Sequence, residues 1–192
     1  MYGGVRMDRR QRKTRTAIFQ AFEELLRTKR AEQITVGEII QRADVGRATF
    51  YAHFETKDAL LEALCEELFC HIFDGLEGET AHHHIFDCEA PDSVFLHLFQ
   101  HLAKDDHGIL KLFAGENNEI FLGYFKQGLV RLIESQIAAD IDLPRDFRVH
   151  QIAAFFTETV RWWIYRKMQE TPEELYGYFM TALTKPLVPV IL

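Results

Sequence analysis

The chain has 192 residues, of which 47% are hydrophobic and 27% charged, as expected of a globular protein with a buried core. No stretch approaches the roughly 18 apolar residues that cross a bilayer, and the basic N-terminus lacks a signal-peptide core, so we expect neither membrane insertion nor export. The net charge of −7 is unevenly distributed: residues 1–57 hold 12 Lys and Arg against 7 Asp and Glu (+5), and residues 58–192 hold 10 against 22 (−12). A basic head on an acidic body is compatible with binding a polyanion through one face.

The first predicted helix runs from about Arg9 to Lys29 and opens with a basic run. Five of the seven residues from Arg9 to Arg15 are Lys or Arg. Such a run is usually a solvated surface. Because a helix-turn-helix pattern follows it, Arg10 and Arg15 are candidates for contact with DNA.

Residues 35–57 predict two short helices joined by a tight turn. Thr35 and Glu38 form a capping box, in which each side chain satisfies the backbone N–H of the other residue and starts a helix. Asp44 tolerates the left-handed geometry of a turn. Gly46 can cap the second helix, although more weakly than Ser or Asp.

The second short helix, from about Arg47 to His53, suits the major groove of DNA. Seven residues at about 1.5 Å each give a rod roughly 10 Å long, and the groove is about 12 Å wide. The alternative is a structural helical hairpin with an ordinary polar face. The side chains expected to contact DNA from this helix and the turn after it are those of Arg47, Thr49, Phe50, Tyr51, His53 and Lys57.

Helical periodicity continues to the C-terminus, and no convincing strand interrupts it. We predict an all-α fold, in which a three-helix head is joined by a long fourth helix to a helical bundle. Residues 74–92 are expected to form a loop, since they hold two glycines, three histidines and Pro91. The predicted helices after the head span about 58–73, 93–102, 108–114, 118–139, 146–169 and 172–183, the last capped by Thr171.

Aromatic residues in the body permit two interpretations. One group could line an effector pocket or simply fill the core: Phe95, Phe99, Phe113, Phe121 and Phe125. The other group lies on the last two helices, where an exposed apolar patch would mark an interface between subunits. Its members are Phe155, Phe156, Trp162, Trp163, Phe179 and Leu183. Some of these residues must also belong to the core.

Histidines suggest a metal site, but the pattern does not favour one. His97 and His101 have the i,i+4 spacing that suits zinc, yet both fall toward the polar side of their helix. His82, His83 and His84 are consecutive and cannot all converge on one ion without strain. We therefore predict no metal and no cofactor. The chain has three cysteines, an odd number without metal-type spacing, which predicts reduced thiols in the cytoplasm.

The segment Thr49-Phe50-Tyr51-Ala52-His53-Phe54 followed by Lys57, with Ile39-Ile40, Ala43 and Val45 before it, resembles the TetR family of bacterial transcriptional regulators. The resemblance covers roughly residues 10–70. The segment 47–57, together with residues 161–175, is similar to the DhaS-like branch, which includes a coactivator of a dihydroxyacetone kinase system. Asp44 and Gly46 depart from the family pattern, where glycine and a Ser or Thr cap are common.

The resemblance implies a DNA-binding domain over residues 9–56 and a ligand-binding and dimerisation domain over residues 57–192. It implies that Tyr51 and Lys57 hold phosphates, and that Arg47, Thr49 and Phe50 face the bases or the groove wall with His53 alongside. It also implies that Thr35 anchors the first short helix to the DNA backbone, and that the last two helices pair in a homodimer. The implied function is a ligand-responsive repressor of a palindromic operator. The alternatives are a DhaS-like protein that gates a partner and an enzyme, for which no catalytic motif is present.

Overall fold

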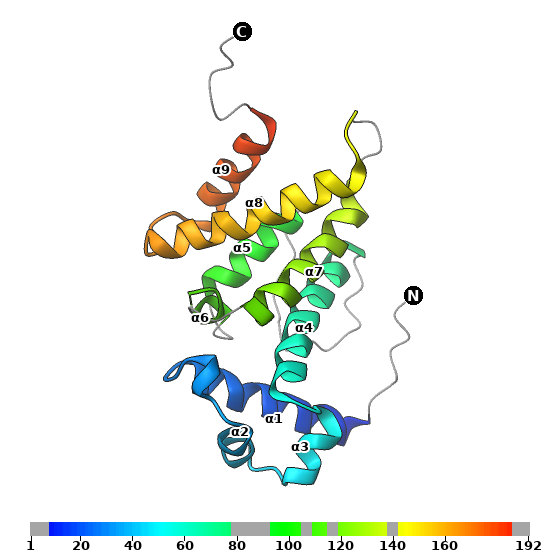
Figure 1. Ribbon diagram of the computed structural model, residues 1–192, viewed down its shortest axis with the longest axis vertical. Helices are drawn as coiled ribbons and strands as arrows, with labels where there is room; N and C mark the ends of the chain where they lie inside the picture. The colour runs from blue at the N-terminus through cyan, green and yellow to red at the C-terminus, as the bar shows by residue number, and fades with distance from the viewer. Residues whose placement is uncertain (1–7, 78–92, 105–108, 115–118, 138–141, 186–192) are drawn as a thin grey trace.

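The computed structural model describes residues 8–77, 93–104, 109–114, 119–137 and 142–185. These residues form an all-α fold, as predicted (Figure 1). None of the described helices combines the length and low polarity needed to cross a membrane. The helices are α1 (Arg9–Leu26), the short 3-10 helix η1 (Ala31–Gln33), α2 (Val36–Ala43), α3 (Arg47–His53), α4 (Lys57–Glu77), α5 (Val94–Lys104), α6 (Ile109–Ala114), α7 (Glu119–Gln136), α8 (Arg145–Tyr165) and α9 (Pro172–Thr184).

The first three helices form a separate head around a small apolar core (Figure 1). Helix α1 places Ile18 and Phe22 in this core at i,i+4 spacing, and both are fully buried. Ile39 of α2 and Phe50 of α3 are also fully buried. The two short helices therefore pack on the long one through one apolar side chain each, with further partly buried neighbours.

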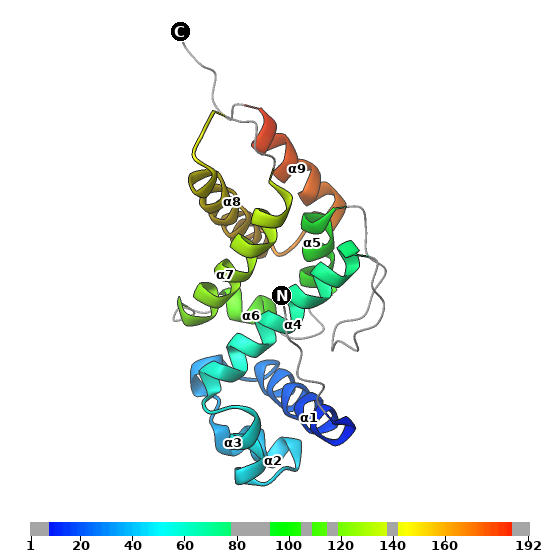
Figure 2. The same ribbon diagram turned by 90° about the vertical axis from the view of Figure 1, so that its right-hand side faces the viewer.

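Helix α4 runs from the head into the body and connects the two (Figure 2). Thr56 caps it, since its Oγ1 accepts a hydrogen bond of 3.0 Å from the Ala59 N–H. Fully buried leucines recur from Leu60 to Leu68, and α4 packs against both α5 and α7. The helix continues to Glu77, so the prediction of a loop is wrong for residues 74–77; residues 78–92 lie outside the described residues.

The body consists of α5 to α9, with α7 packed on α8 and α5 packed on α9. Helix α8 ends at Tyr165, four residues before the predicted end, because Lys167 and Met168 have positive φ angles of 58° and 53°. The Met168 N–H donates to the Trp163 carbonyl at 2.9 Å and closes this turn. Thr171 then caps α9 as predicted, with Glu174 in a capping box.

Gly128 allows α7 to lie close to α4. A Cβ atom added at this residue would lie 2.1 Å from Cδ2 of Phe69, a side chain on α4 that is 2% exposed. The Phe69 ring packs against Phe125 at a centroid distance of 5.2 Å, so it has little room to move. Gly123 lies on the same helix, and a Cβ atom added there would have no other atom within 4 Å.

We expect Gly128→Ala to lower the free energy of unfolding by about 1–3 kcal/mol, because overpacking against Phe69 outweighs the better helix propensity of alanine. Gly123→Ala is the matched control and should raise it by about 0.5–1 kcal/mol. Urea denaturation of both variants measures the difference. Equal shifts in the two variants would contradict the close approach of α4 and α7.

Candidate nucleic-acid interface

The capping box of α2 is formed as predicted. Thr35 Oγ1 accepts from the Glu38 N–H at 3.3 Å, and Glu38 Oε2 accepts from the Thr35 N–H at 3.0 Å. The Lys29 ammonium also pairs with the Glu38 carboxylate. These hydrogen bonds, that of Lys29 first, lower the pKa of Glu38 to about 2. Thr35 itself is exposed, at the end of the helix where N–H groups point outward.

The turn between α2 and α3 depends on Asp44. Its φ of 51° and ψ of 47° place it in the left-handed region, which Asp tolerates better than most residues. The Val45 N–H then donates to the Ile40 carbonyl at 3.2 Å. Gly46 is the N-cap of α3 and makes no side-chain cap, as its lack of a side chain requires. The turn sets α3 at its angle to α2.

Helix α3 exposes a polar face to solvent. Arg47, Thr49 and Tyr51 are exposed, and the Tyr51 side chain is 45% exposed despite its size. His53 is half-buried; burial, together with the charge of Arg15, lowers its pKa below the ordinary value. At neutral pH the His53 ring is therefore mainly neutral, and it offers a hydrogen bond rather than a charge.

Phe50 does not belong to this face, so the prediction that it faces DNA is wrong. It is 0% exposed and lies in the head core. Its ring contacts Tyr51 edge-on at a centroid distance of 5.5 Å and Phe54 at 6.0 Å. The sequence places Phe50 beside exposed residues, but a seven-residue helix needs at least one apolar anchor, and Phe50 provides it.

Arg15 is likewise a structural residue and not an exposed contact for DNA. Its side chain is 19% exposed, and Nε pairs with Glu67 Oε1 at 3.2 Å. The guanidinium also lies 5.0 Å from the ring centroids of both Phe19 and Phe54. Arg15 therefore fastens α1 to α4 and to the end of α3. Arg10 is exposed on the first turns of α1 and remains available.

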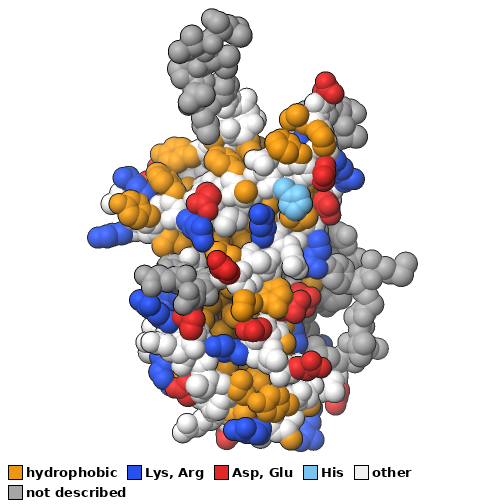
Figure 3. Space-filling view, in the orientation of Figure 1, with side chains coloured by type: hydrophobic (Ala, Val, Ile, Leu, Met, Phe, Trp, Pro, Cys, Tyr) orange, Lys and Arg blue, Asp and Glu red, His pale blue; other side chains and the backbone are white. Residues whose placement is uncertain are grey.

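Lys57 is partly engaged by the protein itself. Its ammonium donates to the carbonyls of Ala31 at 2.7 Å and Ile34 at 3.1 Å. An ammonium has three N–H donors, so at most one remains for a phosphate oxygen. Lys57 thus satisfies the end of η1, an element that the sequence did not predict. Figure 3 shows Lys and Arg side chains at the lower end of the molecule, where α2 and α3 lie in Figure 1.

The aromatic residues predicted to line an effector pocket mostly fill the core. Phe95 is partly buried, and the other four are at most 3% exposed. Phe113, Phe121 and Phe125 contact one another at centroid distances of 4.8 to 5.9 Å. Phe99 stacks on Phe156 at 4.7 Å. The interpretation as core fits this packing, and a pocket among these residues stays a prediction.

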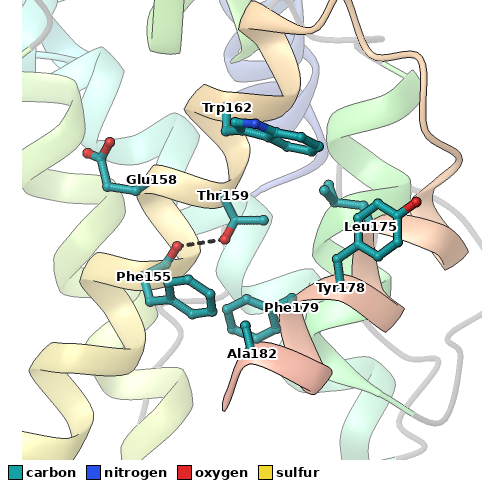
Figure 4. A pocket seen from close by; sticks show the side chains of 8 residues that line it. All are labelled: Phe155, Glu158, Thr159, Trp162, Leu175, Tyr178, Phe179 and Ala182. Carbon is teal, nitrogen blue, oxygen red and sulfur yellow. Dashed lines mark hydrogen bonds between the residues drawn. The ribbon is translucent and has the colours of Figure 1, made fainter. Parts of the chain in front are cut away.

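An apolar groove lies between α8 and α9 (Figure 4). Its lining includes Phe155, Thr159 and Trp162 from α8 and Tyr178 and Ala182 from α9. Trp162 is 44% exposed although it is one of the largest apolar side chains. Tyr178 and Ala182 were not predicted, but Leu175, Tyr178 and Ala182 have the i, i+3, i+7 spacing of one helix face.

The six residues predicted for a subunit interface divide into two groups. Phe156, Trp163 and Phe179 are at most 1% exposed, so they belong to the core of the single chain, although Phe179 also lines the groove between α8 and α9. Phe155 is partly buried, while Trp162 and Leu183 are exposed. At 3.6 residues per turn, apolar residues lie around most of the circumference of α8. The sequence alone therefore could not distinguish the inner face of this helix from its outer face.

The predicted position of His97 and His101 on the polar side of their helix is wrong. His97 is 2% and His101 9% exposed, and both rings lie near His71 of α4. The other histidines considered as metal ligands, His82, His83 and His84, lie outside the described residues.

Comparisons with known proteins agree with one family. Residues 18–64 match the family model described as "Bacterial regulatory proteins, tetR family", and residues 89–185 match that described as "Transcriptional regulator C-terminal region". YvdT, an uncharacterized HTH-type transcriptional regulator of Bacillus subtilis (strain 168), is 33% identical over 61 residues. This match spans 32% of the chain and 31% of YvdT, about a third of the length of that relative.

Solved structures are similar over nearly the whole chain. A TetR transcriptional regulator from Streptococcus agalactiae 2603V is 31% identical, with a TM-score of 0.68 over 92% of this chain and 96% of its own. The dihydroxyacetone kinase operon activator DhaS is 23% identical, with a TM-score of 0.59 over 89% and 94%. The likeness to DhaS is one of fold alone, so the DhaS-like alternative is not favoured.

We expect Phe50→Ala to lower the free energy of unfolding by about 3–5 kcal/mol, because it empties the core beneath α3. Tyr51→Ala, at the next residue, should lower the free energy of unfolding by about 1 kcal/mol or less, because the Tyr51 side chain is largely solvated. Thermal or urea denaturation separates the two. A small effect of Phe50→Ala would contradict its role as the anchor of α3.

Proposed function

This chain belongs to the TetR family of bacterial transcriptional regulators, and from that premise we propose that it is a ligand-responsive repressor that binds a palindromic operator as a homodimer. The family and fold are those of DNA-binding regulators and not of enzymes, as predicted. The observation that supports the proposal best is the exposed polar face of α3, held by a buried Phe50.

DNA contact follows from the chemistry of this face. Arg47 lies in the first turn of α3, where it can donate two hydrogen bonds to guanine O6 and N7. Thr49 can contact a base edge or a thymine methyl group. The Tyr51 hydroxyl and the remaining donor of Lys57 suit phosphates, which position the protein without reading sequence. The proposed DNA-binding residues are therefore Arg10, Thr35, Arg47, Thr49, Tyr51, His53 and Lys57.

Dimerisation is proposed through the groove between α8 and α9. Its lining is mainly apolar, and Phe155, Trp162 and Tyr178 reach it from two helices (Figure 4). A second copy would cover this surface by a two-fold axis, the commonest symmetry of homo-oligomers. Figure 3 shows hydrophobic side chains over α8 and α9 at the upper end of the molecule, and a further group at the lower end, over the head. Two heads on one two-fold axis require two half-sites about one helical turn apart.

Regulation is proposed to act through α4. We assign DNA binding to residues 9–56 and ligand binding with dimerisation to residues 57–192. Helix α4 packs on α5 and α7 in the body, while Arg15 joins it to the head through Glu67. A small molecule that tilts α4 would change the separation of the two α3 helices. The dimer would then lose register with the half-sites, and repression would be released.

We expect Arg47→Ala to weaken binding to the operator by about 10- to 100-fold, since a bidentate contact to one base pair is lost. The operator is obtained by selecting bound sequences from a random duplex library, and affinity is measured by fluorescence anisotropy. Arg131→Ala removes an exposed arginine on α7, far from α3 in the chain, and should leave the affinity unchanged.

The affinities of Arg47→Ala and Arg131→Ala decide whether the exposed face of α3 binds DNA. Selective loss in Arg47→Ala, with an unchanged melting temperature, supports direct readout by α3. Unchanged affinity in Arg47→Ala, or an equal loss in Arg131→Ala, contradicts the assignment of this face to DNA.

We expect Trp162→Glu to shift the protein from dimer to monomer, because it buries a charge in the proposed interface. Ile120→Glu is the matched control, since Ile120 is a similarly exposed apolar residue on α7. Sedimentation velocity at micromolar concentration measures both. A monomeric wild-type protein, or a Trp162→Glu variant that dimerises as the wild type does, contradicts the proposed interface.

A further inference from the structure

Three histidines converge in the body, between two helices. His71 comes from α4, and His97 and His101 come from successive turns of α5. Their ring centroids are 4.8 to 5.1 Å apart, and one ligand nitrogen of each lies within 4.8 Å of the others. All three are at most 9% exposed. Buried imidazoles from two elements rarely meet in this way without a shared role, since each ring displaces apolar packing.

The spacing of the nitrogen atoms fits a tetrahedral ion. Two ligands at about 2.1 Å from a tetrahedral zinc ion lie roughly 3.4 Å apart. Nε2 of His97 and Nε2 of His101 are 3.3 Å apart, which matches one edge of that tetrahedron. The widest separation in the cluster, 4.8 Å, exceeds this edge by about 1.4 Å. Rotation of an imidazole ring about its side-chain bonds closes such a gap.

The donor set selects the class of ion. Three imidazole nitrogens suit zinc and its neighbours among the divalent transition metals, whereas magnesium and calcium require oxygen ligands. A metal ion binds the neutral form of an imidazole ring. Three protein ligands leave the fourth position for water or an anion.

We propose that His71, His97 and His101 bind one divalent transition-metal ion, of which zinc is the best match, and that this ion joins α4 to α5. The site lies on α4 in the body, at some distance along the helix from Lys57 and the head. An ion that binds the folded chain and not the unfolded chain raises the stability of the fold. Binding of the ion can be tested without an operator.

The test uses the full-length protein, freed of metal with a chelator and titrated with Zn²⁺ by calorimetry and with Co²⁺ by absorption spectroscopy. We expect one ion per chain and a higher melting temperature with Zn²⁺. The Co²⁺ complex should show intense visible bands of tetrahedral cobalt, without the near-ultraviolet charge-transfer band that a cysteine thiolate gives. This spectrum tests the donor set in the wild-type protein, without a substitution in the core.

Variants locate the ion. His97→Gln and His101→Gln should each weaken Zn²⁺ binding by more than about 100-fold while the metal-free protein stays folded. The first control, a triple variant with His82→Gln, His83→Gln and His84→Gln, removes the other histidine group of the sequence. The second control, His150→Gln, changes an exposed histidine on α8. Both controls should bind as the wild type does. Absence of stoichiometric Zn²⁺ binding, binding lost only in the triple variant, or a thiolate band in the Co²⁺ spectrum overturns the proposal.

Discussion

The burial of Phe50 beneath α3 is the interaction on which the rest of the DNA-binding face depends. A helix of seven residues is not stable alone, because its few hydrogen bonds do not offset the cost of nucleation. Phe50 is buried in the head core, Phe54 packs edge-on against Phe19 of α1 at 5.5 Å, and Arg15 lies over the rings of Phe19 and Phe54 while it pairs with Glu67. This arrangement leaves Arg47, Thr49 and Tyr51 in solvent on a fixed rod. The face is therefore presented before DNA arrives, and little ordering entropy remains to be lost on binding.

Helix α4 is the element through which head and body can influence each other. In the first turn of α4, Lys57 donates a hydrogen bond to η1. In the middle of the helix, Glu67 forms an ion pair with Arg15, and Phe69 lies against Gly128 of α7. The close approach at Gly128 leaves few ways for α4 to move relative to α7. A displacement of α4 in the body therefore moves the whole helix, including the end that contacts the head. The histidine cluster of α4 and α5 lies on the same rod.

Local signals in the sequence predicted much of this fold. The capping box at Thr35, the left-handed Asp44 and the caps at Gly46 and Thr171 follow from residue chemistry within four positions, and all are confirmed. Tertiary contacts were harder to predict. Phe50 and Arg15 were assigned to DNA because neighbouring residues suggest it, yet partners 4 to 52 positions away bury them. His97 and His101 lie beside the apolar stripe of their helix, and only α4, folded beside α5, reveals that this side is also buried.

The central claim is that α3 enters the major groove while basic and hydroxyl side chains hold the phosphates. The most direct measurement is the affinity for a selected duplex as a function of salt concentration. We expect the logarithm of the association constant to fall linearly with the logarithm of the salt concentration, with a slope of about −0.9 for each phosphate neutralised. The association constant should also depend on the duplex sequence at every salt concentration. An affinity that does not change with salt, or no binding to any duplex at low ionic strength, would contradict the account.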